Sequence, residues 1–171
     1  MQTTAILKSF DDSFNILLQL IAAFPQDRLN TVPFEGSWTG AQVARHLQKS
    51  SPAGLLYGHT GPTERQPDML VAPLRQTFLD FTVKFKAPEV LEPENVEYVK
   101  ENLLSELEIT AAAIRKGIQT LDLSVTCLDW EMPQTGYLTR LEWVSFYTVH
   151  TQRHTRQLQN IFETVIRKTY A

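Results

Sequence analysis

The sequence has a single cysteine, Cys127, so the chain cannot form a disulfide within itself. It has no apolar run that approaches the roughly 20 residues of a membrane-spanning helix. Its first residues lack the basic stretch and the following apolar stretch of a secretory signal. These absences fit a reducing compartment, and we expect a cytoplasmic protein with no membrane partner.

The sequence also has no excess of positive charge. Its 16 Lys and Arg residues face 19 Asp and Glu residues, which gives a formal net charge of -3 at pH 7, and the basic residues form no runs. Because nucleic acids are bound through basic patches, a nucleic-acid partner is disfavoured. The hydrophobic fraction of 43% is ordinary for a globular protein. The length suits one domain, which we expect to span residues 1–171.

No segment shows a convincing alternation of apolar and polar residues, and the sequence contains no evident internal repeat. Apolar residues recur instead at steps of three and four, which is the spacing of an amphipathic helix. This pattern predicts four long helices, over residues 3–23, from residue 40 to about 58, over 95–121 and over 140–168.

The predicted second and fourth helices have recognisable starting signals. Thr39 with Gln42, and Thr139 with Glu142, have the spacing of capping boxes, in which two side chains satisfy main-chain donors at a helix start. Pro52 marks the point where the second helix kinks or stops.

The connection between the second and third helices is long. Residues 58–93 are divided into short pieces by Pro62, Pro67, Pro73, Pro88 and Pro93. A helix is possible over residues 74–85, where it would carry Phe78, Phe81 and Phe85. Because a structureless connection of this length is unusual in a compact domain, we expect these aromatics to cover one end or flank of the helices. The sequence therefore predicts an all-α, four-helix bundle of up-and-down style with a long second connection.

Two histidines have the spacing of metal ligands. His150 and His154 lie four residues apart in a segment without Gly or Pro, so a helix places them one turn apart on one face. The same face carries Trp143, Tyr147 and Ile161, and it must point toward the other helices. Two imidazoles buried among aromatics need polar partners. A metal ion is one such partner, and a pair of exposed or hydrogen-bonded histidines is the alternative.

His46 is the available third ligand. It lies beside Leu47 on the inward side of the predicted second helix, and it reaches the other two histidines only if the second and fourth helices pack together. Three neutral imidazoles suit a divalent transition metal and leave coordination positions open to water or substrate. Zinc and nickel are favoured, and iron, copper and manganese stay open.

Several other side chains are candidates for supporting roles. Asp129 and Glu131 are either proton-handling carboxylates or exposed loop residues. Tyr147 either lines a pocket or packs in the core. Gln157, three residues after His154, has the position to hydrogen-bond an imidazole. No residue is assigned as a general acid or base.

We expect His59 and Cys127 to take no part in the functional site. His59 lies between Gly58 and Gly61 and is predicted to be a solvent-exposed loop residue. Cys127 has no neighbouring histidine or basic residue that would activate its thiol, so we expect it to be packed as a small side chain.

The stretches S-W-T-G-A-Q-V-A-R-H-L, ending at Leu47, and G-Y-L-T-R-L-E-W-V-S-F-Y-T-V-H-T-Q-R-H-T-R-Q-L, ending at Leu158, resemble the helix signatures of the DinB/YfiT-like superfamily. With the order and length of the helices, the resemblance covers nearly the whole chain. It implies a four-helix bundle in which His46, His150 and His154 bind a divalent cation, often zinc or nickel. It also implies a homodimer.

The resemblance implies fold and metal more firmly than chemistry, because reactions in the superfamily vary. The expected function is a metal-dependent enzyme that activates a low-molecular-weight thiol for transfer to a small-molecule electrophile, or water for hydrolysis. The alternative is a non-catalytic metal-binding or stress-response scaffold. DNA binding is disfavoured by the acidic charge balance.

Overall fold

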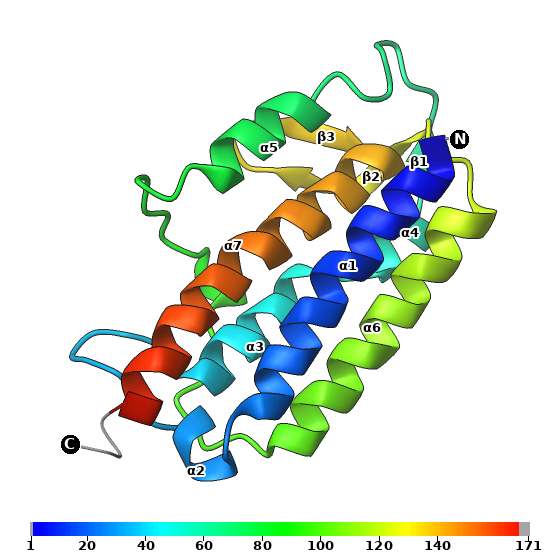
Figure 1. Ribbon diagram of the computed structural model, residues 1–171. Coiled ribbons are helices and arrows are strands. Elements are labelled where there is room, and N and C mark those ends of the chain that lie inside the picture. Colours follow the sequence, from blue (N-terminus) through cyan, green and yellow to red (C-terminus); the bar gives the residue numbers. More distant parts are fainter. Residues whose placement is uncertain (1, 168–171) are drawn as a thin grey trace.

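The structure is a computed structural model that describes residues 2–167. Its long helices lie side by side in one bundle (Figure 1): α1 (Gln2–Ala23), α3 (Gly40–Ser50), α6 (Lys100–Thr120) and α7 (Arg140–Arg167). Helices α1 and α3 each contact both α6 and α7. The predicted all-α four-helix bundle is confirmed. The predicted end of the last helix at Lys168 lies outside the described residues.

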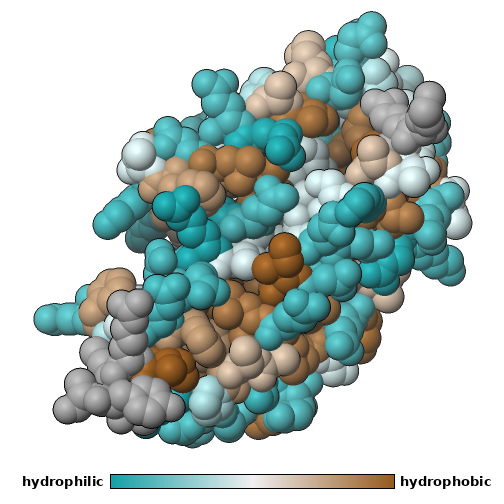
Figure 2. Space-filling view, viewed as in Figure 1, coloured by the Kyte–Doolittle hydropathy of each residue, from teal (hydrophilic) through white to brown (hydrophobic). Residues whose placement is uncertain are grey.

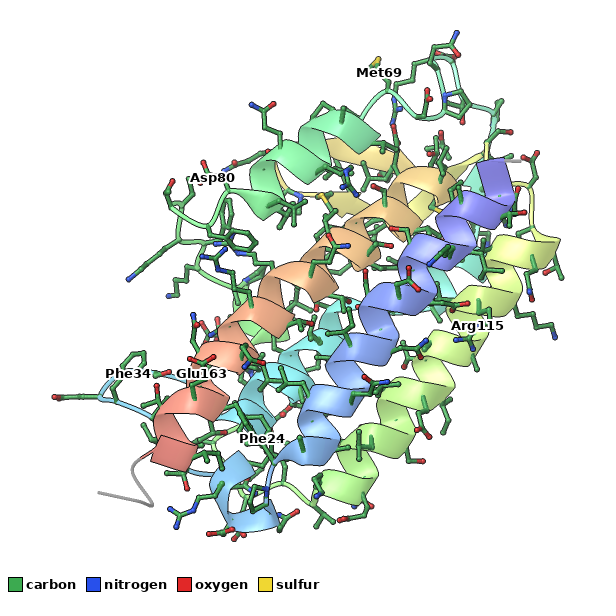
Figure 3. All side chains as sticks on the ribbon, viewed as in Figure 1. Phe24, Phe34, Met69, Asp80, Arg115 and Glu163 are labelled. Atoms are coloured by element: carbon green, nitrogen blue, oxygen red, sulfur yellow. The ribbon has the colours of Figure 1, made fainter. Side chains whose placement is uncertain are left out.

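The long connection of residues 51–99 returns the chain to the end of the bundle from which α3 starts. Helices α3 and α6 therefore run parallel to each other, and so do α1 and α7 (Figure 1). Near the lower end of the bundle, Phe24 (labelled in Figure 3) packs edge-on against Phe162 with ring centroids 4.8 Å apart. There Lys100 Nζ donates to the Phe24 carbonyl at 2.9 Å. The helix directions thus come in parallel pairs, so the expected up-and-down style is wrong, because the long connection crosses back along the bundle before α6.

The helix starts follow the predicted capping boxes. Thr39 Oγ1 accepts from the Gln42 main-chain N–H at 3.1 Å, and Gln42 Oε1 accepts from the Thr39 N–H at 3.0 Å. Thr139 and Glu142 make the same reciprocal pair at 3.1 and 2.9 Å. Since a capping box satisfies orphan donors of the first turn, these pairs fix where α3 and α7 begin.

The core is divided into two clusters along α7. One contains Trp143 and Tyr147 with Phe10 and Phe14 of α1, and the other contains Leu158 with residues from α1, α3 and α6. The turns of α7 between Tyr147 and Leu158 carry the two histidines. The bundle therefore has a polar layer between two apolar ones.

A small sheet that the sequence pattern did not indicate covers the other end of the bundle. Strands β1 (Thr60–Gly61), β2 (Thr126–Met132) and β3 (Gly136–Thr139) pair antiparallel in the order β1-β2-β3. Residues 133–135 form the turn of the β2–β3 hairpin. Regular alternation is missing because a register shift interrupts β2 and only Cys127 and Met132 are buried in it.

The long connection contains short helices, whose bounds differ from the predicted ones. These are α4 (Gly54–Tyr57), α5 (Val71–Leu79) and the 3-10 helix η1 (Glu89–Leu91). The expected helix over residues 74–85 starts earlier and ends at Leu79. Asp80, directly after α5 (Figure 3), accepts from the Thr82 N–H at 2.9 Å and forms a turn that competes with the helix. As expected, Phe78 covers a flank, and its ring lies 5.0 Å from that of Phe146.

The third predicted helix also starts later than expected, at Lys100. Two side chains accept hydrogen bonds from main-chain N–H groups at the start of α6 and just before it. They belong to Gln26, in the short helix α2 (Gln26–Leu29), and to Asn30, which follows that helix. Gln26 Oε1 accepts from the Lys100 N–H at 2.8 Å, and Asn30 Oδ1 accepts from the Tyr98 N–H at 3.0 Å. These bonds satisfy the N–H groups of Tyr98 and Lys100 while the backbone at Val99 is extended. The helix therefore does not extend back to residue 95.

None of the described helices is long and apolar enough to cross a membrane. The face drawn in Figure 2 intersperses hydrophilic and hydrophobic residues. Scattered surface apolar residues of this kind are normal for a folded domain.

A buried carboxylate ties the long connection to the start of α7. Glu142 is 0% exposed and accepts from Arg65 Nη2 at 2.6 Å and from the Leu70 main-chain N–H at 2.8 Å. Burial alone would raise the pKa of Glu142. The hydrogen bonds from Arg65, Thr139 and Leu70 outweigh burial and hold that pKa below its ordinary value.

We expect Glu142→Gln to lower the free energy of unfolding by about 2 kcal/mol, because Arg65 then loses a charged partner. Since the native pKa is depressed below 4.5, the stabilisation by Glu142 is present above this value and is lost as the pH falls through the native pKa. Urea unfolding at several pH values should therefore show that the free energy of unfolding falls more at acid pH in the wild type than in Glu142→Gln. Glu131→Gln, at an exposed strand position, is the control. Identical pH profiles for wild type and Glu142→Gln would contradict this assignment.

Candidate metal centre

The structure brings the three predicted histidines together. His46 comes from α3, and His150 and His154 come from successive turns of α7, which packs against α3. His150 Nε2 lies 3.4 Å from His46 Nε2 and 3.0 Å from His154 Nε2. One ligand atom from each residue lies within 4.8 Å of the others. The predicted packing of the second and fourth helices is thus the arrangement that joins the three imidazoles.

The other ring nitrogen of each histidine has a hydrogen-bond acceptor. His46 Nδ1 lies 2.9 Å from the Leu91 carbonyl, which can only accept, so His46 carries its proton on Nδ1. His154 Nδ1 lies 2.8 Å from Gln157 Oε1. Both contacts leave the Nε2 lone pair free and directed at the centre of the group. This is how surrounding groups orient metal-binding imidazoles.

His150 has the same orientation through Ser50. The Ser50 hydroxyl donates to the Leu47 carbonyl at 3.4 Å, so its lone pair is available to the His150 Nδ1–H at 3.3 Å. With all three Nδ1 atoms protonated, the three Nε2 lone pairs face one another. Such an arrangement of acceptors is unfavourable unless a cation lies between them.

Two of the separations between ligand nitrogens fit a transition metal. Metal–nitrogen bonds of about 2.0–2.1 Å separate two ligand nitrogens by roughly 2.9 Å at a right angle and roughly 3.4 Å at a tetrahedral angle. The two Nε2 separations of 3.0 and 3.4 Å fall in this interval. The three-histidine group can therefore hold a divalent metal ion.

Burial keeps the three imidazoles neutral, as metal ligands must be. Burial lowers the pKa of His46 despite its bond to Leu91, and Lys49 lowers it further. The pKa of His150 falls well below its ordinary value for the same reason, with the two other histidines adding to the effect. Burial lowers the pKa of His154 to about 3.

Aromatic rings surround the group. Phe146 stacks on the His150 ring with centroids 4.9 Å apart, and Phe78 meets the same ring edge-on at 5.8 Å. The Trp38 ring lies 5.1 Å from that of His46. These contacts restrict the rotation of the His46 and His150 rings and shield them from water.

The group offers three candidate protein ligands. Among the described residues, no Cys, Asp or Glu joins the three histidines as a fourth member. His46 and His150 are buried, whereas His154 is only partly buried. Three protein ligands are typical of catalytic zinc sites, whereas structural sites have four.

The other residues that the sequence suggested for supporting roles lie in different surroundings. The predicted bond of Gln157 to an imidazole is confirmed. Tyr147 belongs to the core, because it is 0% exposed and its hydroxyl donates to the Pro52 carbonyl at 3.1 Å. Asp129 is paired with His59 at 2.8 Å, and His59 is exposed as predicted. Glu131 is an exposed strand residue outside the three-histidine group.

Cys127 is packed in the core, as predicted. Its side chain is 0% exposed, and burial raises the pKa of its thiol to about 11. Because the thiolate is the reactive form, Cys127 has no role as a nucleophile at neutral pH.

The sequence reading missed the groups that hold His46 and His150. Ser50 lies four residues after His46, so its position on the same helical face was a signal that could have identified it. The Leu91 carbonyl has no such signal, because a main-chain acceptor is common to all residue types.

We expect Gln157→Ala to weaken metal binding about tenfold or more, because His154 loses the acceptor that fixes its tautomer. Gln159→Ala is the matched control, since Gln159 is an exposed residue of the same helix that bonds Glu163 at 3.1 Å. Competition between each protein and a chromophoric chelator for zinc gives the affinities. Equal loss in both variants would show that Gln157 does not act through His154.

Comparison with known proteins agrees with the helical fold. The sequence model of the DinB superfamily matches residues 9–158, a span that contains all three histidines. The comparison with curated proteins found no match. A solved structure described as "Crystal structure of TT2238, a four-helix bundle protein" has the same fold, with a TM-score of 0.58 and 20% sequence identity over 92% of this chain and 98% of that chain. Because the family match spans most of the chain, this protein belongs to the DinB superfamily.

Proposed function

We propose that this protein is a metal-dependent enzyme in which His46, His150 and His154 bind a divalent cation that activates a small thiol or water. The observation that carries the proposal is the convergence of three neutral Nε2 atoms with no fourth protein ligand among the described residues. Three imidazoles suit zinc or nickel, and they also accept iron or copper. An open coordination position is what distinguishes a catalytic site from a structural one.

A bound divalent cation lowers the pKa of a ligated thiol or water, so that a nucleophile forms at neutral pH. The protein supports this chemistry with Leu91, Gln157 and Ser50, which hold the imidazole protons on Nδ1. The aromatic rings of Phe146, Phe78 and Trp38 exclude water from the histidines. A low-dielectric surrounding of this kind strengthens the interaction between a cation and an anionic nucleophile.

Transfer of a low-molecular-weight thiol to a small electrophile is the preferred reaction, and hydrolysis is its rival. The apolar rings beside the site favour a substrate with an apolar part next to its reactive atom. Asp129 and Glu131 are not used in this proposal, because Asp129 is paired with His59 on the sheet and Glu131 is exposed.

The second candidate is a non-catalytic protein in which the cation only joins α3 to α7. The observation that favours it is the location of the histidines on two different helices, so that the ion would crosslink them. The two candidates differ in how the fold depends on the metal. Assembly into homodimers and a cytoplasmic location stay predictions.

For an enzyme we expect the cobalt-loaded protein to develop a sulfur-to-cobalt charge-transfer band when low-molecular-weight thiols are added. The band requires a thiolate in the open coordination position, and His150→Ala should show neither the band nor stoichiometric cobalt. Turnover is then measured with the zinc and nickel forms and a panel of electrophiles. Stoichiometric cobalt with no thiol band, and no thiol- or water-dependent turnover, would count against catalysis.

Metal removal separates the two candidates. Because the two apolar clusters flank the histidines on both sides, we expect the chelated protein to keep its helical circular dichroism and a cooperative thermal transition. The midpoint temperature of this transition should fall only by the amount expected when a ligand that binds the native state is removed. Loss of the folded state on chelation, recovered by added zinc, would favour the scaffold instead.

A further inference from the structure

The segment that supplies the Leu91 carbonyl has little regular structure of its own. Between α5 and α6 it contains only the 3-10 helix η1, whose last residue is Leu91. Yet this carbonyl accepts the proton of a buried histidine at 2.9 Å. Something outside the metal centre must therefore hold the segment in place.

Glu94 has the contacts to do this. Its carboxylate accepts from Arg45 Nε at 3.1 Å, from Lys49 Nζ at 3.2 Å and from the Tyr98 hydroxyl at 2.9 Å. The side chain is partly exposed, so each of these bonds alone would be weak. Together they form a network of three donors on one carboxylate, which is more effective than isolated pairs.

The donors lie on both sides of the metal-binding residue. Arg45 immediately precedes His46, and Lys49 follows it by three residues, so all three belong to the same stretch of α3. Lys49 Nζ also donates to the Glu92 carbonyl at 2.6 Å. The turn of α3 that carries His46 is therefore tied to the residue after Leu91 and to Glu94.

The pKa of Glu94 agrees with an ionised carboxylate in this network. Its own main-chain N–H, followed by Arg45, Tyr98 and Lys49, lowers the pKa to about 2. The carboxylate keeps its negative charge throughout the range in which imidazoles bind metals.

We propose that Glu94 is a positioning residue for the metal centre, which holds the segment around Leu91 against α3 so that the Leu91 carbonyl keeps the proton of His46 on Nδ1. This inference rests on the proposed metal binding, because Glu94 acts only through His46. Without the carboxylate, the segment can withdraw and His46 is free to adopt the other tautomer. The Nε2 atom then carries a proton and is lost as a ligand.

The experiment compares Glu94→Gln with Glu97→Gln, an exposed carboxylate three residues along the same segment. Zinc affinity is measured by chelator competition, and the tautomer of His46 in the metal-free protein is read from the nitrogen-15 chemical shifts of its ring. We expect Glu94→Gln to bind zinc about tenfold or more weakly and to populate the tautomer protonated on Nε2. Glu97→Gln should match the wild type in both measurements.

A second variant keeps the proposal open to refutation if Glu94→Gln folds poorly. Lys49→Met removes the bonds to Glu92 and Glu94 from the helix side, and it should shift the tautomer and the zinc affinity in the same direction. Wild-type affinity and tautomer in folded Glu94→Gln and Lys49→Met would overturn the positioning role. Failure of the wild type itself to bind zinc, nickel or cobalt would instead overturn the proposed function.

Discussion

The candidate metal centre depends on one electrostatic constraint, the meeting of three imidazole lone pairs inside an apolar bundle. Each Nδ1 has an acceptor, so each Nε2 points without a proton toward the other two. Burial opposes protonation of the rings, which would otherwise relieve the repulsion. A divalent cation relieves the same repulsion and also fits the two Nε2 separations that involve His150.

This meeting of the imidazoles requires a particular arrangement of the helices. Helices α3 and α7 must be neighbours for His46 to reach the pair on α7, and the two capping boxes fix where those helices begin. The apolar clusters on either side of the polar layer stabilise the packing without the histidines. A site of this kind is rigid because its residues come from long helices with buried faces on both sides.

The irregular connection is part of the site as well. Phe78 is in contact with the His150 ring, and the Leu91 carbonyl binds His46, although both residues lie far from these histidines in the sequence. The buried Glu142 and the surface Glu94 tie this connection to α7 and α3 respectively. Members of one fold family differ in chemistry through such segments, since a shared bundle does not determine the reaction.

The sequence by itself determined the four long helices, the capped starts of α3 and α7 and the three candidate ligands. Periodicity and capping are local properties, and the spacing of His150 and His154 places both rings on one face of any helix they form. Only the tertiary structure decided the parallel helix pairs, the β2–β3 hairpin and the partners of His46 and His150. These features depend on main-chain carbonyls and on contacts between residues some 40 to 100 positions apart, for which a single sequence carries no periodic signal.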